Sequence, residues 1–211
     1  MQSKTSSRNM TIFSMFLAIE LILLFTPLGF IRLPGLSITL MHIPVIAAGI
    51  LLGVKYGAGL GLVFGLCSVW NATMQPGVTS FIFSPFVTVA GISGNWTSLI
   101  IAIVPRVLLG VIAGLVFEAL NKKLPRAASA GIAAVIATLC HTLMVLGLIA
   151  MIWGPQYAQA IGQSPDTLLF YLGMVIVTNG LAEMGVAGVV LMALAKAIKP
   201  IKTPAMSAGK A

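Results

Sequence analysis

Long apolar stretches dominate the chain, and short segments rich in polar residues, glycine or proline separate them. A helix that crosses a membrane needs about 20 predominantly apolar residues. Six stretches come close to this length and predict six transmembrane helices. The expected helices cover residues 11–30, 36–54, 56–72, 98–120, 127–153 and 167–197. We therefore expect an all-α integral membrane protein in which residues 1–211 form a single domain.

The longest connection, residues 73–97, is apolar but shows no helical period. It holds several aromatic residues and is interrupted by prolines and glycines. Irregular backbone cannot face lipid, because its amide groups would lack hydrogen-bond partners. We expect this segment to be an outer lid over a binding site, since long apolar loops of this kind are usually functional. The alternative is a re-entrant structural plug.

Composition supports the membrane assignment. Only 8% of the residues are charged, whereas soluble proteins carry about 25%. The mean hydropathy is +1.08. A soluble domain of this size needs a charged surface, so a soluble enzyme, a disordered chain and a secreted disulfide scaffold are all excluded. The net charge of +8 would suggest nucleic acid in a soluble protein, but here we interpret it as a topology signal.

The basic residues are distributed unevenly between the two sides of the expected bundle. Ten of the twelve fall on one side: Lys4, Arg8, Lys55, Lys122, Lys123, Arg126, Lys196, Lys199, Lys202 and Lys210. Arg32 is expected in a loop on the other side. Cytoplasmic loops collect Lys and Arg, so this bias predicts that both termini are cytoplasmic. An even number of spans, such as six, agrees with that orientation.

Arg106 is the strongest candidate for ligand contact, because an ionisable residue inside a membrane is costly and usually functional. It lies about 10–12 Å into its helix, directly after Pro105, where we expect a freed backbone carbonyl at Ala102. A guanidinium there could hold a carboxylate through two hydrogen bonds. The alternatives are an ion pair with Glu183 or snorkelling. Glu183 is a weaker candidate, since a depth of about 24 Å would place it too deep to share a ligand with Arg106.

Other polar side chains are expected in the outer half of the bundle. The further candidates for ligand binding are Asn71, Asn179, His141, Asn95, Trp96 and, more weakly, Tyr171. A single buried histidine is often a core residue, and an aromatic residue near the membrane boundary often belongs to an interfacial belt. An apolar cavity with a few convergent polar groups is typical of a small-molecule site. One net cation favours a small anionic or zwitterionic ligand.

Small residues recur on two helices. Gly53, Gly57, Gly61 and Gly65 follow one another at every fourth position, which favours close packing within the chain. Ser14 and Ala18 form a second small pair on the first helix. Their spacing alone leaves two functions open, namely internal packing and docking of a helix from another protein.

The sequence lacks the usual motifs of catalysis. It has no P-loop and no H-E-x-x-H metal motif, and the two cysteines show no metal or disulfide spacing. Gly91-Ile92-Ser93-Gly94, with His141 on a later helix, weakly matches a rhomboid-like intramembrane protease. We predict no enzyme activity, no catalytic residue, no cofactor, no metal and no nucleic-acid partner. The absence of a visible inverted repeat argues against the other rival, a stand-alone small transporter.

Several segments resemble the substrate-binding S components of energy-coupling factor (ECF) transporters. The resemblance rests on residues 41–49, 52–57, 80–86 and 104–110, and it is nearest to the pantothenate-type branch. It implies a multi-pass protein of the prokaryotic plasma membrane that binds a vitamin from outside, most simply pantothenate, whose carboxylate could pair with Arg106. Folate, cobalamin or riboflavin is the alternative substrate.

The resemblance also implies partners. S components deliver their vitamin through a transmembrane coupling (T) component driven by two cytoplasmic ATPases, and they are thought to topple within the lipid bilayer. Helix 1 of the family carries an A-x-x-x-A-type motif that docks on the coupling component. Ser14 and Ala18 stand at the matching place, with serine for the first alanine. The resemblance therefore favours docking for this pair.

Overall fold

A computed structural model describes residues 2–27, 29–33 and 36–198. Within these residues, seven α-helices, short 3-10 and π turns and two small β-hairpins follow one another. The elements are α1 (Gln2–Leu24), β1 (Phe30–Leu33), β2 (Leu36–Thr39), α2 (His42–Leu52), α3 (Val54–Met74), η1 (Ser80–Ile82), β3 (Thr88–Val89), β4 (Ile92–Ser93), α4 (Trp96–Leu120), α5 (Arg126–Ala160), η2 (Pro165–Thr167), α6 (Leu168–Val175), η3 (Ile176–Gly180) and α7 (Leu181–Ala197).

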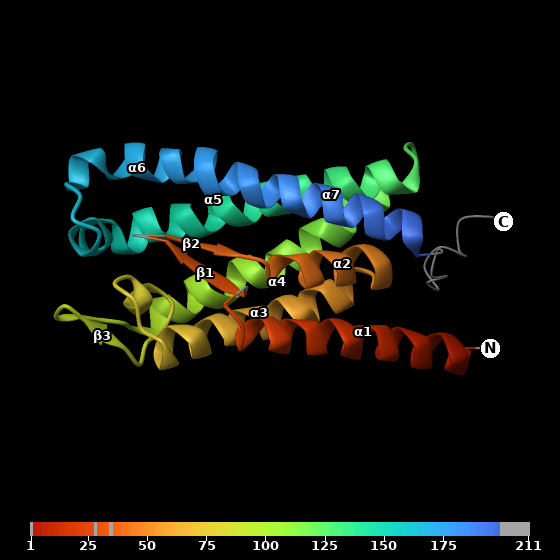
Figure 1. The fold of residues 1–211 in the computed structure, drawn as a ribbon, viewed down its shortest axis with the longest axis horizontal. Helices are drawn as coiled ribbons and strands as arrows, with labels where there is room; N and C mark the ends of the chain where they lie inside the picture. The colour runs from red at the N-terminus through yellow and green to blue at the C-terminus, as the bar shows by residue number, and fades with distance from the viewer. Residues whose placement is uncertain (1, 28, 34–35, 199–211) are drawn as a thin grey trace.

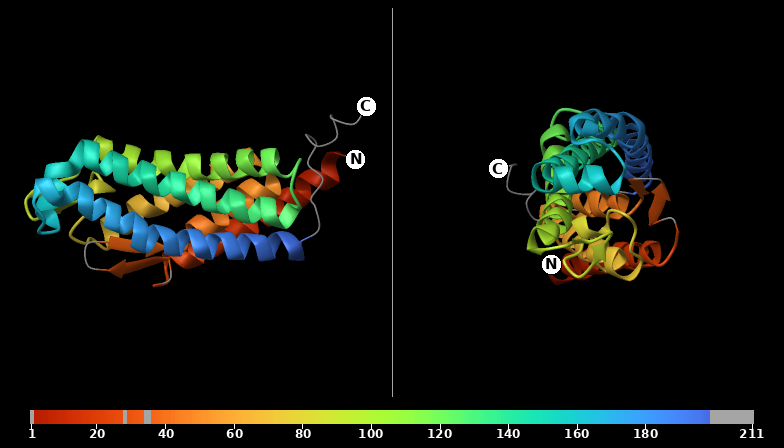
Figure 2. Two further views of the ribbon diagram at one scale, coloured as in Figure 1. Left: turned by 90° about the horizontal axis from the view of Figure 1, so that it is seen from above. Right: turned by 90° about the vertical axis from the view of Figure 1, so that its left-hand side faces the viewer.

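The helices run roughly along one direction and form an elongated bundle (Figure 1). The start of α1 and the end of α7 lie at the same end of this bundle, and the views in Figure 2 agree. The β3–β4 hairpin and the turn between α5 and α6 lie at the opposite end. We call these the terminal end and the loop end. The described start and end of the chain thus lie at one end of the bundle, while six spans with cytoplasmic termini stay a prediction.

Within the described residues, five helical segments are long and apolar enough to cross a membrane. They are Ser7–Leu24, Val54–Met74, Trp96–Leu120, Arg126–Ala160 and Pro165–Ala197. The last is not one regular helix, because α6 and α7 are joined by the π turn η3. The expected bounds of α3 and α4 are confirmed to within two residues. Membrane-spanning helices therefore account for most of the chain.

The expected helix at residues 36–54 is wrong in its first part. Residues 36–39 form strand β2, which pairs antiparallel with β1, with Phe30 opposite Thr39. The helix begins only at His42 and has 11 residues, or about 16 Å of rise. This is about half of a hydrocarbon core of about 30 Å. The alternation of apolar and polar residues in Leu-Ser-Ile-Thr is the strand signal that the overall hydrophobicity concealed.

Three other boundaries also differ from expectation. The first helix begins at Gln2 and not near residue 11. The first helix ends at Leu24 and not near residue 30, because Thr26 precedes a proline, a position that disfavours helical backbone. Turns close the segment through hydrogen bonds from the Thr26 N–H to the Leu23 carbonyl and from the Gly29 N–H to the Thr26 carbonyl. At the other extreme, α5 continues to Ala160 and not to Trp153. Its 35 residues correspond to about 52 Å, so it extends well past a bilayer core.

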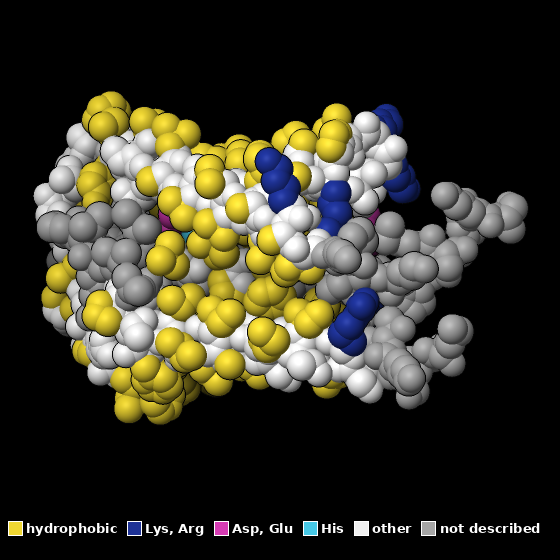
Figure 3. Space-filling view, turned by 45° about the vertical axis from the view of Figure 1, so that its right-hand side comes forward, with side chains coloured by type: hydrophobic (Ala, Val, Ile, Leu, Met, Phe, Trp, Pro, Cys, Tyr) yellow, Lys and Arg dark blue, Asp and Glu magenta, His cyan; other side chains and the backbone are white. Residues whose placement is uncertain are grey.

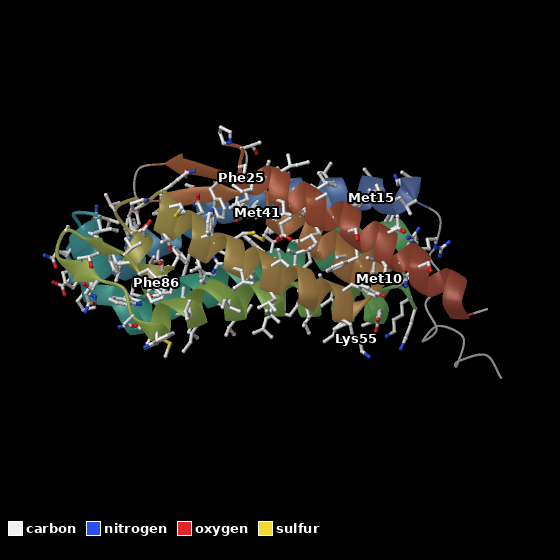
Figure 4. All side chains as sticks on the ribbon, turned by 90° about the horizontal axis from the view of Figure 1, so that it is seen from below. Met10, Met15, Phe25, Met41, Lys55 and Phe86 are labelled. Atoms are coloured by element: carbon white, nitrogen blue, oxygen red, sulfur yellow. The ribbon has the colours of Figure 1, made fainter. Side chains whose placement is uncertain are left out.

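Helix α2 forms the centre of the bundle. Ten of its eleven residues are buried, and it packs against α1, α3, α4 and α7. A helix that is apolar on all sides is stable only when it is surrounded, and this environment supplies that condition. Met41, directly before α2, is fully buried and lies inside the bundle in Figure 4.

Glycines bring α3 unusually close to α4. A Cβ atom at Gly61 would lie 2.2 Å from the carbonyl oxygen of Arg106, and one at Gly57 would lie 2.6 Å from that of Gly110. A Cβ at Gly65 would lie 2.9 Å from the Ala102 carbonyl oxygen. Three glycines of the predicted stripe therefore serve internal packing, whereas Gly53 has open space around it and lies before α3. This contact fixes the backbone of α4 at the level of Arg106.

The segment between α3 and α4 is more ordered than expected. It contains η1 and the β3–β4 hairpin, and Phe81, Ile82 and Ser84 are fully buried. The Ser98 hydroxyl donates to the Phe81 carbonyl at 2.7 Å, and the Phe81 ring meets Trp153 edge to face. The segment is thus packed on the loop end of α4 and α5. Its action as a lid remains a prediction.

Lysine and arginine side chains gather toward the terminal end, whereas apolar side chains are spread over the middle of the surface seen in Figure 3. Lys55 lies at the same end in Figure 4. Lys199, Lys202 and Lys210, and the side chains of Lys4 and Arg32, lie outside the described part of the chain. The Arg126 guanidinium donates to the carbonyls of Ala195 and Ile198, which joins the start of α5 to the end of α7.

Candidate ligand-binding cavity

A cavity of about 220 Å³ lies between the helices toward the loop end. Residues from α3, α4, α5, η3 and α7 line it, together with the β1–β2 hairpin and the segment between α3 and α4. The polar and charged lining residues are Thr39, Ser68, Asn71, Thr79, Ser80, Arg106, His141, Thr142, Tyr157, Asn179 and Glu183. The other ten lining residues are glycine or apolar, so the cavity combines apolar walls with polar groups, of which Arg106 and Glu183 are charged.

Arg106 is held in the cavity wall by its own helix and by two aromatic rings. Its side chain is only 6% exposed, and its Nη1 donates to the Ile101 carbonyl at 2.5 Å. Its Cζ atom lies 5.5 Å from the centre of the Phe64 ring and 5.2 Å from that of Phe83. Both distances fall within the range of cation–π attraction.

Pro105 explains why that carbonyl is available. An α-helical N–H bonds to the carbonyl four residues earlier, and proline has no N–H, so Pro105 frees the carbonyl of Ile101. The expected position, Ala102, is therefore wrong by one residue. Arg106 satisfies the freed group with one of its nitrogens, while its buried Nε has no hydrogen-bond partner within the described chain. A buried guanidinium with unused donors is suited to an anionic ligand.

The π turn η3 aims two neighbouring residues into the cavity. A π turn inserts one extra residue into a helical turn, and such turns are often found at functional sites. Asn179 and Gly180 lie in this turn, and both line the cavity. Thr178 donates to Asn179 Oδ1 at 3.1 Å, whereas the buried Nδ2 has no partner among the described residues. Asn179 therefore offers a hydrogen-bond donor to a ligand.

Glu183 also lines the cavity, so the expectation that it lies too deep to share this space with Arg106 is wrong. The depth estimate assumed that α4 and the last helical segment begin at the same level. Helix α5 instead continues to Ala160, and the turn that follows it lies at the extreme loop end. Counting from the start of α6 therefore overstates the depth of Glu183. Its Oε1 accepts a hydrogen bond from the Thr39 N–H at 2.8 Å.

His141 and Asn71 complete the predicted residues that the fold brings together. His141 is 7% exposed, its ring centre lies 6.2 Å from that of Phe64, and its Nε2 has no hydrogen-bond partner in the described residues. Asn71 lines the cavity near the end of α3. Five predicted residues thus face one space: Asn71, Arg106, His141, Asn179 and Glu183.

The other three predicted residues do not line this cavity. Asn95 is the N-cap of α4, where its Oδ1 accepts from the Thr97 N–H at 2.8 Å and its own N–H donates to the Ser98 hydroxyl. Trp96 begins α4 and is 76% exposed. Tyr171 packs beside the apolar cluster around Trp153. A capping role for Asn95 was visible in the sequence, because asparagine three residues before serine at a helix start is a capping pattern.

Some lining residues were not predicted. Ser68, Asn71 and Ala72 share one face of α3 at helical spacing, so the face of Asn71 was a signal for Ser68. Thr39 and Tyr157 were missed because their elements were assigned differently, as a helix and as a loop. Phe83, which lines the cavity, and Phe64, whose ring also lies beside Arg106, were not predicted, because these positions depend on tertiary contacts.

Ser14 and Ala18 are both exposed on α1. Met10, Met15 and Phe25 on and beside the same helix are also exposed, and Figure 4 shows where they lie along it. Neither side chain is buried against the rest of the described chain. Docking of a partner helix on this pair stays a prediction.

The protease alternative requires Ser93 to approach His141. Ser93 is exposed in the β3–β4 hairpin and shares a 2.9 Å hydrogen bond with Thr88. His141 lies in α5 and lines the cavity, and Ser93 does not line it. The two residues therefore do not form a nucleophile and base pair in this structure.

The fold indicates a multi-pass helical membrane protein, and it encloses a cavity with polar and apolar walls. A family model described as "ECF transporter, substrate-specific component" matches residues 8–195. The chain therefore belongs to the substrate-specific components of ECF transporters, and it is a transporter protein of the plasma membrane.

Two curated relatives are similar over nearly their whole length. The pantothenic acid transporter PanT of Lactococcus lactis subsp. cremoris is 35% identical over 198 residues, which cover 92% of this chain and 95% of the relative. The pantothenate transporter PanT of Leuconostoc mesenteroides subsp. mesenteroides is 28% identical over 201 residues, which cover 90% of this chain and 91% of the relative.

Proposed function

We propose that this protein is a pantothenate-binding S component, which captures the vitamin from outside the cell in the cavity around Arg106. The observation that carries this proposal is a buried guanidinium, with its Nε unpaired among the described residues, in a cavity that also has apolar walls. Pantothenate has one carboxylate and a branched apolar body, which match these two properties. The pantothenate transporters that resemble this chain support the same substrate.

Arg106 supplies the main polar contact in this proposal. The vitamin's carboxylate accepts charge-assisted hydrogen bonds from the guanidinium, whose charge is also stabilised by the rings of Phe64 and Phe83. Asn179 and His141 offer further hydrogen-bonding atoms to the ligand's amide or hydroxyl groups. Asn71 and Ser68 line the same cavity from α3. Asn95, Trp96 and Tyr171 are left out of this contact set.

The proposed orientation places the terminal end in the cytoplasm. The exposed Lys55 and the other basic residues at that end fit the cytoplasmic enrichment of lysine and arginine. In this orientation six passes cross or enter the membrane, α2 together with the β1–β2 hairpin forming the short one. The cavity then lies toward the outer face, with the segment between α3 and α4 as its lid.

Release into the cell requires other proteins in this account. The chain carries no P-loop motif, so energy from ATP must come from partners. We propose that the exposed Ser14 and Ala18 dock on a transmembrane coupling component, which two cytoplasmic ATPases drive. Small residues at such an interface let two helix backbones approach closely.

Calorimetry on the purified protein with a panel of vitamins tests the substrate. We expect heat on addition of pantothenate without ATP, and none with folate, cobalamin or riboflavin. Heat only with another vitamin would reject pantothenate but keep the class. Uptake into liposomes that contain this chain alone, without ATPases, would instead favour the stand-alone transporter.

A further inference from the structure

Glu183 brings an acidic group into the cavity that also holds Arg106. Glu183 lies in α7 and Arg106 in α4, and each of these helices packs against α5. The two charges therefore enter the same space from different walls. A ligand in this cavity therefore lies near a cationic group and an acidic group. These two groups favour different functional groups on the ligand.

One oxygen of Glu183 is already committed, which fixes the carboxyl group in place. Oε1 accepts from the Thr39 N–H at 2.8 Å. Thr39 is itself held, since its hydroxyl donates to the Gly29 carbonyl at 2.7 Å and accepts from the Met41 N–H at 3.1 Å. The carboxyl group is thus positioned by backbone atoms. A positioned group loses little entropy when a ligand arrives.

The second oxygen of Glu183 has no hydrogen-bond partner among the residues that the structure describes. In its ionised form the carboxyl group only accepts hydrogen bonds, so a ligand group that faces this oxygen then has to be a donor. A ligand anion at the same position would be repelled. The guanidinium of Arg106 imposes the opposite demand, because it only donates.

Pantothenate satisfies both demands in one direction only. Its carboxylate is at one end of the molecule, and its two hydroxyl groups are at the pantoyl end. With the carboxylate at Arg106, a hydroxyl can donate to Glu183. With the molecule reversed, two carboxylates would face each other, and Arg106 would meet only neutral hydroxyls.

We propose that Glu183 accepts a hydrogen bond from a hydroxyl of the pantoyl end and, with Arg106, fixes the direction in which the ligand lies. The proposal rests on the proposed function, because it takes pantothenate as the ligand. It makes Glu183 a specificity residue that requires a hydrogen-bond donor and excludes a second negative charge. Such a site rejects an analogue without the donor, because the bound ligand would then enclose an acceptor that stays unpaired.

The test compares two ligands on the wild-type protein by calorimetry. The second ligand is N-(3,3-dimethylbutanoyl)-β-alanine, which keeps the carboxylate, the amide and the branched alkyl group but lacks both hydroxyls. We expect it to bind about 10- to 150-fold more weakly than pantothenate, the factor for one hydrogen bond to a charged group. Equal affinity for the two ligands would overturn the proposal without any variant.

Two variants then assign the effect to Glu183. Glu183→Gln keeps an oxygen for the Thr39 N–H but removes the charge, and we expect the ratio of the two affinities to shrink at least fivefold. Glu118→Gln makes the same change at an exposed carboxylate near the terminal end of α4 and should keep the wild-type ratio. An unchanged ratio in Glu183→Gln would overturn the role of Glu183. Absence of pantothenate heat from the wild type would instead overturn the proposed function, so the two failures are distinguishable.

Discussion

The close contact between α3 and α4 makes a sharp prediction about Gly61. An alanine there would place its Cβ 2.2 Å from the Arg106 carbonyl oxygen, whereas ordinary contacts begin at 3.4 Å. The helices would have to separate by the difference, about 1.2 Å. The obstacle is backbone, so no side-chain rotation can relieve it. Overpacking of this kind costs about 1–3 kcal/mol, more than the 0.5–1 kcal/mol that alanine gains over glycine inside a helix.

The same displacement should reach the ligand. Helix α3 carries Ser68 and Asn71, and α4 carries Arg106, so separating them moves two walls of the cavity. A hydrogen bond of about 2.9 Å lengthened by about 1 Å is lost. We therefore expect Gly61→Ala to lower the free energy of unfolding by about 1–2 kcal/mol and to weaken pantothenate binding about tenfold or more.

Gly59 on the same helix is the matched control. A Cβ there would lie 3.8 Å from the Phe13 ring, an ordinary contact. Gly59→Ala should therefore unfold at the wild-type temperature or slightly above it and bind normally. Tryptophan fluorescence during heating in detergent, followed by calorimetry, measures both properties. If Gly61→Ala were as stable and bound as tightly as Gly59→Ala, the close approach of α3 to α4 would be refuted.

Two further predictions concern the surface and the terminal end. Ala18→Trp should abolish uptake by cells that contain the coupling module but leave binding by the purified protein intact. Val189→Trp, on an exposed part of α7, should leave both uptake and binding unchanged. Normal uptake with Ala18→Trp would refute the docking surface. Arg126→Ala should lower the free energy of unfolding by about 1–2 kcal/mol, because two carbonyls at the end of α7 lose a charged hydrogen-bond donor. Lys123→Ala, at an exposed position, should leave thermal unfolding unchanged. Equal stability of these two variants would show that the bonds of Arg126 contribute nothing.

Hydrophobicity predicted the helices that face lipid along their length. Helices α3 and α4 begin and end within two residues of the expected positions, because the apolar period stops abruptly at their ends. Hydrophobicity did not predict the strand at residues 36–39, because this strand and the buried helix that follows it have similar average hydrophobicity. Separating them required the alternation along Leu36–Thr39, which is a signal of only four residues.

The sequence predicted the polar residues of the candidate site from their chemical type. It did not predict which other residues the tertiary fold brings next to them. Arg106 stood out because a buried cation is costly in a membrane, and the cavity confirms that it faces a space with Asn71, Asn179 and His141. Its aromatic neighbours Phe64 and Phe83 come from elements whose mutual packing the sequence does not reveal. Asn95 was predicted to bind the ligand because it is polar. Its position at the start of a helix, where asparagine often caps the backbone, was not considered.

Glu183 shows why depth along a helix is a weak guide to neighbours in space. The estimate depended on where each helix meets the membrane surface, and α5 extends beyond its expected end at Trp153 to Ala160. The π turn then changes the direction in which the following side chains point. A count based on 3.6 residues per turn does not include this change. These features arise from packing among helices rather than from local sequence.

The central claim is that Arg106 holds the carboxylate of pantothenate in this cavity. Calorimetry of pantothenate and of panthenol, in which an alcohol replaces the carboxylate, tests it most directly. The wild type should bind panthenol about 10- to 150-fold more weakly, and Arg106→Ala should bind the two ligands with nearly equal affinity. Equal binding of both ligands by the wild type, or a full preference for pantothenate retained in Arg106→Ala, would contradict it.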